Sequence, residues 1–136
     1  MELTPQWNVF ANMISQTAKL TAVPLTPTQV GNWPVGVPAH IYNVWSTYDF
    51  AIAGVSGFRA GAGASFNSLT YCNTANNARI PSSTVIDTML GYYTTHWDAQ
   101  FGVKNVANVT YFTTAESAGG YVGDPRTFYL KAAWHY

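Results

Sequence analysis

Apolar and polar residues alternate with a period of two along much of this chain, as they do in β-strands whose two faces meet different surroundings. The clearest segment ends the chain, and its apolar face comprises Phe128, Leu130, Ala132, Trp134 and Tyr136. Three segments alternate clearly (58–67, 97–104 and 128–136) and three others less regularly, and each of the six is close to the length of about 9–11 residues at which a tilted strand crosses a bilayer. They span residues 7–14, 40–50, 58–67, 84–93, 97–104 and 128–136.

The connections between these segments alternate between long and short. Long connections span residues 19–39, 71–82 and 108–125, and short ones lie near 51–57 and 94–96. Long loops at one end of a hairpin array and tight turns at the other are typical of outer-membrane barrels. The sequence therefore predicts an all-β fold: an antiparallel meander of about six outer-membrane-type strands that forms a partial transmembrane β-barrel.

Aromatic residues make up 15% of the chain, and many of them fall next to the short connections or at the C-terminus. This set comprises Tyr48, Phe50, Phe58, Tyr92, Trp97, Trp134 and Tyr136. Amphipathic rings prefer the headgroup level of a bilayer, so we expect an aromatic belt at that end of the strands. The alternative is that these rings form the core of a soluble sheet.

Composition narrows the class of protein without deciding it. Charged residues make up only 9% of the chain, whereas a soluble domain carries about a quarter. No apolar run approaches the roughly 20 residues of a membrane-spanning helix. Six basic residues balance six acidic ones, which argues against nucleic acid as a partner. A soluble all-β domain with few surface charges would have a similar composition.

Candidate catalytic or metal-binding groups are sparse. His40, His96 and His135 are scattered, and no Ser–His–Asp or paired-carboxylate arrangement is visible. Asp98 follows His96 at an expected turn, where we predict a solvated ion pair. Cys72 is the only cysteine, so no internal disulfide can form, and no Cys and His spacing indicates zinc. The sequence therefore predicts no enzyme, no cofactor and no bound metal.

Five stretches of sequence are distinctive together and in their order. They are WNVFANMISQTAKL, GNWPVGVPAHIYNVWSTYDF, IPSSTVIDTMLGYY, FGVKNVANVTYF and GDPRTFYLKAAWHY. In this order the chain resembles the C-terminal portion of TonB-dependent siderophore receptors, outer-membrane transporters that import ferric chelates. The resemblance makes Asp87 an inward-facing aspartate. The chain departs from the family pattern at three positions. Ala107 stands where a phenylalanine is usual, Asn108 stands where an aspartate is usual, and Tyr136 replaces a terminal phenylalanine.

The resemblance implies that residues 1–136 form one barrel segment, without the plug domain and the earlier strands of a receptor of about 22 strands. Its implied partners are the remaining barrel strands, the plug domain, the lipid bilayer and, in the parent receptor, a ferric siderophore. The implied location is the bacterial outer membrane, although MELTPQWNVF has no signal-peptide character.

Six strands are fewer than the eight or more of bacterial barrels, so we expect no transport by the chain alone. Three explanations remain open. The chain is a fragment, or it donates strands to a barrel completed by another chain or by its own copies. Alternatively, it is a small soluble β-barrel or sandwich that binds an apolar ligand.

Siderophore receptors recognise their ligands with aromatic and arginine side chains above the lumen. The resemblance therefore nominates five loop residues as ligand-binding: Tyr71, Arg79, Tyr111, Phe112 and Tyr121. The alternative is that these are ordinary solvated loop residues. On the polar face, Gly61 and Gly63 either let another body, the plug in that family, pack closely or ease the curvature of the sheet.

Overall fold

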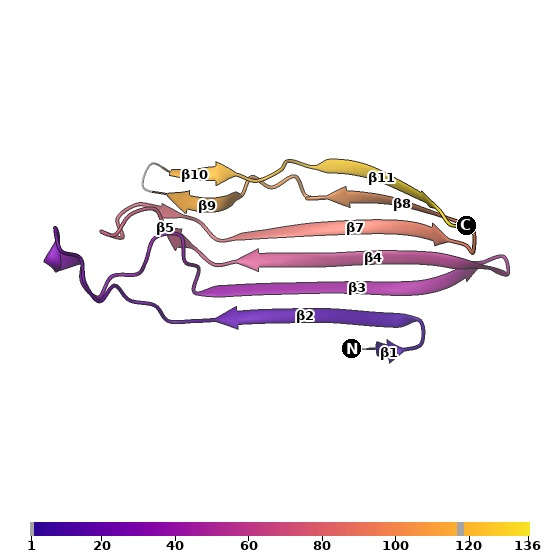
Figure 1. Cartoon of the computed structure of the whole chain (residues 1–136), viewed down its shortest axis with the longest axis horizontal. Helices are drawn as coiled ribbons and strands as arrows, with labels where there is room; N and C mark the ends of the chain where they lie inside the picture. Colours follow the sequence, from indigo (N-terminus) through magenta and orange to yellow (C-terminus); the bar gives the residue numbers. More distant parts are fainter. Residues whose placement is uncertain (1, 117–118) are drawn as a thin grey trace.

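The computed structural model describes residues 2–116 and 119–136, and its main feature is one antiparallel sheet (Figure 1). Six long strands follow one another across this sheet as predicted, and β1 adds a seventh strand of three residues at one edge. In sheet order the strands are β1 (Glu2–Thr4), β2 (Trp7–Ser15), β3 (His40–Ile52), β4 (Val55–Asn67), β7 (Ser83–Tyr93), β8 (Trp97–Lys104) and β11 (Thr127–Trp134). The predicted all-β antiparallel meander is confirmed.

Short turns join the strands at one end of the sheet, on the right in Figure 1. The β3–β4 turn is the residue pair Ala53 and Gly54, both with positive φ (49° and 82°), as in the tightest hairpin turns. The β7–β8 turn is closed by the Thr94 hydroxyl, which accepts from the Trp97 amide at 3.0 Å and donates to the Trp97 carbonyl at 2.7 Å. The tight β3–β4 turn and the Thr94 hydrogen bonds of the β7–β8 turn help to set the register of these two hairpins.

The long connections lie at the opposite end and carry structure that the sequence analysis treated as loop. The first contains the 3-10 turn η1 (Pro27–Gln29). The second contains the paired strands β5 (Thr70–Tyr71) and β6 (Arg79–Ile80), and the third contains the hairpin of β9 (Phe112–Glu116) and β10 (Gly119–Val122). Long structureless loops are uncommon because their backbone groups need partners, and these segments find them in each other.

The two faces of the sheet differ in polarity. Directly opposed residues on neighbouring strands form an apolar face whose large side chains are exposed: Trp7, Met13, Val44, Ile86, Leu90, Phe101, Phe128, Leu130 and Trp134. Among the described residues, the buried apolar ones are only Cys72 and Ala115. A soluble sandwich would cover the apolar face with a second layer, and no described element does so. This face therefore suits an apolar medium such as lipid.

A row of aromatic rings in contact follows the apolar face at the short-turn end. Ring centroids lie 5.7 Å apart for Phe50 and Phe58, 4.6 Å for Phe58 and Tyr92, and 5.4 Å for Tyr92 and Trp97. The row crosses β3, β4, β7 and β8 at one level, as expected for an interfacial belt. Among residues 2–116 and 119–136, no helix has the length and hydrophobicity needed to cross a membrane.

The prediction that the last strand runs to Tyr136 is wrong, because β11 ends at Trp134. Trp134 pairs with Trp97, the first residue of β8, so the partner strand ends there. One more backbone bond, from the His135 amide to the His96 carbonyl at 2.7 Å, follows before the chain leaves the sheet. Tyr136 is fully exposed.

The apolar face can be tested with single-tryptophan variants in micelles of a brominated detergent, which quenches indoles in contact with acyl chains. A variant that keeps only Trp134, on the apolar face, is expected to be strongly quenched. The matched variant that keeps only Trp45, on the polar face, is expected to retain its fluorescence. Equal quenching of both would contradict the assignment of the two faces.

Candidate ligand-binding site

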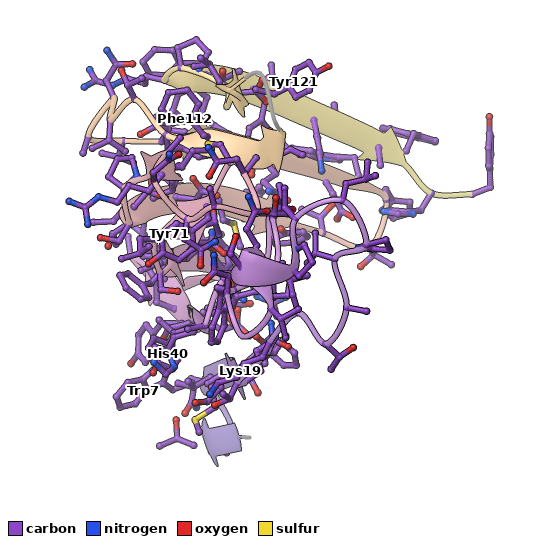
Figure 2. All side chains as sticks on the ribbon, turned by 90° about the vertical axis from the view of Figure 1, so that its left-hand side faces the viewer. Trp7, Lys19, His40, Tyr71, Phe112 and Tyr121 are labelled. Atoms are coloured by element: carbon purple, nitrogen blue, oxygen red, sulfur yellow. The ribbon has the colours of Figure 1, made fainter. Side chains whose placement is uncertain are left out.

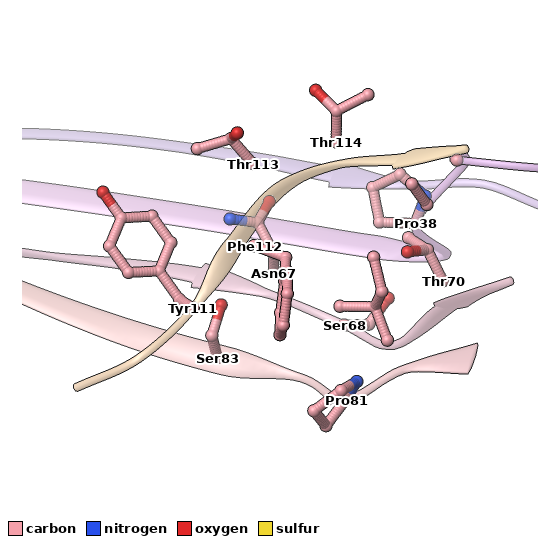
Figure 3. Close-up of a pocket in the computed structure, with 13 residues that line it drawn as sticks. Pro38, Asn67, Ser68, Thr70, Pro81, Ser83, Tyr111, Phe112, Thr113 and Thr114 are labelled. Carbon is pink, nitrogen blue, oxygen red and sulfur yellow. The ribbon is translucent and has the colours of Figure 1, made fainter. Parts of the chain in front are cut away.

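The three long connections meet at one end of the polar face and enclose a hollow of about 230 Å³ (Figure 3). Strands β4 and β7 form its floor, because Asn67 and Ser83 are directly opposed at their ends. Parts of all three connections form the walls. The lining residues are Gly36, Pro38, Asn67, Ser68, Thr70, Ile80, Pro81, Ser83, Tyr111, Phe112, Thr113, Thr114 and Ala115.

Hydrogen bonds hold the first long connection against the second. Asn76 exchanges bonds with the backbone of Trp33: its Oδ1 accepts from the Trp33 amide at 2.8 Å, and its Nδ2 donates to the Trp33 carbonyl at 2.9 Å. Val35 forms a parallel bridge with Tyr71, and the Gly36 amide donates to the Tyr71 carbonyl at 3.0 Å. This wall of the hollow is therefore held in place by the chain itself.

The third connection is anchored by Asn105, whose side chain is 1% exposed. Its Nδ2 donates to the carbonyls of Val109 (2.8 Å) and Asp124 (3.1 Å), and its Oδ1 accepts from the Val109 amide at 2.9 Å. Its own amide donates to Asp87 Oδ1 at 2.8 Å, and its φ of 51° is one that asparagine tolerates. Asp87 and Asn105 thus fix the point at which this connection leaves β8. The only sequence signal was the position of Asn105 directly after a predicted strand.

The β9–β10 hairpin closes over the second connection at a glycine. A Cβ atom on Gly120 would lie 2.6 Å from Ile80 Cδ1 and 2.9 Å from Phe112 Cδ1. The hairpin also approaches the first connection, because a Cβ atom on Gly36 would lie 3.2 Å from the Ala115 carbonyl oxygen. Because both positions are glycine, the three connections can pack closely against one another there.

Of the five nominated ligand-binding residues, Tyr111 and Phe112 line the hollow, and Tyr71, Arg79 and Tyr121 do not. Tyr71 and Arg79 are opposed in the β5–β6 pair. Their neighbours Thr70 and Ile80 line the hollow instead, since successive strand residues point to opposite sides.

Tyr121 is 63% exposed on β10. Figure 2 shows Phe112 and Tyr71 within the loop cluster and Tyr121 at its periphery. Asn67 and Ser83 are not among the nominated residues, because their meeting depends on the pairing of β4 with β7.

A row of polar side chains ties five strands together on the polar face, nearer the short turns. Asp49 accepts two hydrogen bonds from Arg59, at 2.5 and 2.8 Å, and the Arg59 guanidinium lies 5.4 Å from the centre of the Tyr93 ring. The Tyr93 hydroxyl donates to Gln100 Oε1 at 3.3 Å, and Gln100 Nε2 donates to the Tyr129 hydroxyl at 2.9 Å. These groups satisfy one another across β3, β4, β7, β8 and β11, so the row reinforces the sheet.

Aromatic rings cover glycines on the same face. A Cβ atom on Gly63 would lie 2.3 Å from the ring of Trp45, the residue directly opposite on β3, and one on Gly61 would lie 3.0 Å from that ring. Tyr129 covers Gly102, its direct partner on β8, in the same way. The space that these glycines leave above the sheet is therefore filled by aromatic rings from neighbouring strands.

The predicted partner of Asp98 was His96, but Asp98 contacts a different histidine. Asp98 Oδ2 lies 2.8 Å from His135 Nε2, and both side chains are partly exposed. The described residues contain no group of three His, Cys, Asp or Glu side chains arranged to hold a metal ion.

Comparison with known proteins identifies similar sequences. A family model described as TonB dependent receptor-like, beta-barrel matches residues 1–106. The ferrichrome outer membrane transporter/phage receptor of Escherichia coli (strain K12) is 34% identical over 65 residues, which are 48% of this chain and 9% of that protein. The probable TonB-dependent receptor BfrD of Bordetella pertussis is 28% identical over 120 residues, which are 81% of this chain and 16% of that protein.

Solved structures agree with the sequence matches. The siderophore receptor PiuA from Acinetobacter baumannii superimposes with a TM-score of 0.83 at 25% identity, over 96% of this chain and 20% of that chain. The ferric-catecholate import receptor Fiu from E. coli K12, in its closed form, gives a TM-score of 0.75 at 25% identity, over 99% of this chain and 19% of that chain. This chain thus spans a fifth or less of the length of these relatives.

The anchoring role of Asn105 predicts a local effect of Asn105→Ala. The substitution removes the part-buried hydrogen bonds to the backbone of Val109 and Asp124, and each such bond contributes about 0.5–1.5 kcal/mol. In micelles, hydrogen exchange of residues 106–110 should accelerate by about tenfold to a hundredfold, with little change in β3 and β4. Val106→Ala, at an exposed neighbour, is the control. Equal exchange rates in the two variants would contradict the anchor.

Proposed function

This chain belongs to the TonB-dependent receptor β-barrel family, and we propose that it forms part of the wall of an outer-membrane receptor that takes up ferric siderophores. The observation that carries the proposal is the sheet itself, with an exposed apolar face, a polar face behind it, short turns at one end and packed loops at the other. The names of its relatives, among them a siderophore receptor and a ferrichrome transporter, support the choice of cargo.

The proposed orientation follows from the asymmetry of the two ends. Outer-membrane barrels keep short turns on the periplasmic side and longer loops outside the cell. The Ala53–Gly54 turn would then face the periplasm, and the hollow between the long connections would face the exterior. The apolar face would contact lipid, and the face with Asp49, Arg59 and Gln100 would contact the lumen.

We further propose that the chain works only together with additional strands and a plug domain. No pairing joins β1 to β11 within the described residues, so each of these strands keeps one edge without a partner. Each unpaired backbone group in hydrocarbon costs several kcal/mol, and bacterial barrels have eight strands or more. The chain alone is therefore not expected to transport a siderophore.

Ligand contact is proposed for the walls of the hollow, with Tyr111 and Phe112 among the groups involved. The nominated residues Tyr71, Arg79 and Tyr121 lie outside the lining of the hollow, so any ligand contact that they make would come from elsewhere in the same loop cluster. The iron of a siderophore arrives already coordinated by the chelate, so this proposal requires no protein ligand to the metal.

The experiment is to compare the folding of the whole chain in plain buffer and in detergent micelles. Circular dichroism should show β-structure only in micelles, with aggregation in buffer, because the apolar face has no cover. Leu90→Lys, on that face, should weaken the partition into micelles by about 2–4 kcal/mol, and Ser65→Lys, on the polar face of β4, should change it little. A monodisperse species that unfolds cooperatively in plain buffer would overturn the proposal.

A further inference from the structure

The hollow differs from the rest of the polar face in its charge. None of the thirteen residues that line it is an Asp, Glu, Lys, Arg or His. Nearer the short turns, the same face presents Asp49, Arg59, Asp98 and Lys131. A ligand in the hollow would therefore meet hydroxyl, amide, aromatic and backbone groups.

Several of these polar groups have free hydrogen-bonding capacity. The side chains of Asn67 and Ser83 make no hydrogen bond within the described part of the chain. The Ser68 hydroxyl accepts from the His40 amide at 3.0 Å and keeps its own proton to donate. Amides and hydroxyls both donate and accept, which matches a neutral polar ligand. Figure 3 shows Phe112 on the same side of β9 as Asn67 and Ser83, where its ring adds an apolar surface.

An anion would bind poorly in these surroundings. Entry into the hollow removes part of its hydration, and that loss is compensated only when a cation or several donors replace the water. Arg79 is adjacent in sequence to the lining residue Ile80, but it is exposed and lies outside the lining. The described lining therefore provides no cation to compensate the charge of a negative ligand.

We propose that this hollow selects neutral ferric chelates of the trihydroxamate class over anionic tricatecholate chelates. The inference rests on the proposed receptor function. Three hydroxamate groups, each with one negative charge, cancel the charge of ferric iron, whereas three catecholates leave three negative charges. The hollow, at about 230 Å³, is smaller than the roughly 300–1,000 Å³ of a complete small-molecule site. It therefore receives one edge of a chelate, and the rest lies in the lumen.

The test uses the complete 136-residue chain folded in detergent micelles and equilibrium dialysis against two radioiron-loaded probes, a neutral ferric trihydroxamate and a ferric tricatecholate. The trihydroxamate should bind at least about tenfold more tightly, the scale of one charge-dependent interaction. Asn67→Lys places a cation on the floor of the hollow and should raise tricatecholate affinity by about tenfold. Ala75→Lys adds the same charge at an exposed loop position outside the lining and should leave the ratio unchanged.

Each contrary result has a distinct meaning. Equal or tighter tricatecholate binding by the unaltered chain overturns the charge selectivity and leaves the receptor proposal standing. Equal effects of lysine at positions 67 and 75 also overturn it, since selectivity would then arise outside the hollow. Binding of neither probe by a chain folded in micelles overturns the hollow as a chelate site. The receptor proposal itself is tested by a separate observation: it fails if the chain folds in plain buffer.

Discussion

The ladder of backbone hydrogen bonds between neighbouring strands is the constraint on which the rest of this structure depends. In hydrocarbon no water can satisfy an amide or a carbonyl, so each strand needs a partner on both sides. The register of the ladder also decides the faces, because a slip of one residue would exchange them. The tight Ala53–Gly54 turn and the direct opposition of Asp49 and Arg59 oppose such a slip between β3 and β4. A slip of one residue between these strands would bring Asp49 or Arg59 to the apolar face.

The polar face shows how a sheet without a hydrophobic core is stabilised. Its side chains pair across strands, from Asp49 through Arg59 and Tyr93 to Gln100 and Tyr129. Elsewhere on this face, rings of Trp45 and Tyr129 cover glycines on the adjacent strand. Both devices use neighbours that the ladder has already brought into contact. They stiffen the wall and leave the opposite face free to meet lipid.

In the long connections, backbone amides and carbonyls that no long strand reaches also need hydrogen-bond partners. Asn76 and Asn105 use their side-chain amides to satisfy backbone groups that no strand reaches. The β5–β6 pair and the β9–β10 hairpin satisfy others. The three connections are consequently packed against one another, and the hollow between them has defined walls. A preformed site loses less conformational entropy on binding than one assembled from mobile loops.

Local pattern was sufficient to locate the six long strands and to identify the apolar face where alternation is clear, in residues 58–67, 97–104 and 128–136. The alternation that places Phe101 and Leu130 outward has a period of two and needs no knowledge of the partner strand, and tight turns and long loops are equally visible in sequence. The end of β11 at Trp134 was missed because it depends on where β8 begins. The short strand β1 and the small ladders of the long connections were missed because they are too short to show a period.

The set of residues that line the hollow could not be predicted from the sequence, for a related reason. Asn67 meets Ser83 only through the pairing of β4 with β7, and Tyr111 and Phe112 reach them only because the third connection, anchored at Asn105, returns over the second. Tyr71 and Arg79 carry suitable chemistry but face away from the hollow, since strand geometry turns neighbouring residues to opposite sides. The sequence by itself determined the apolar face of the clearly alternating strands, because that property repeats every two residues. Only the tertiary structure decided which polar residues share a site, because that depends on contacts between distant parts of the chain.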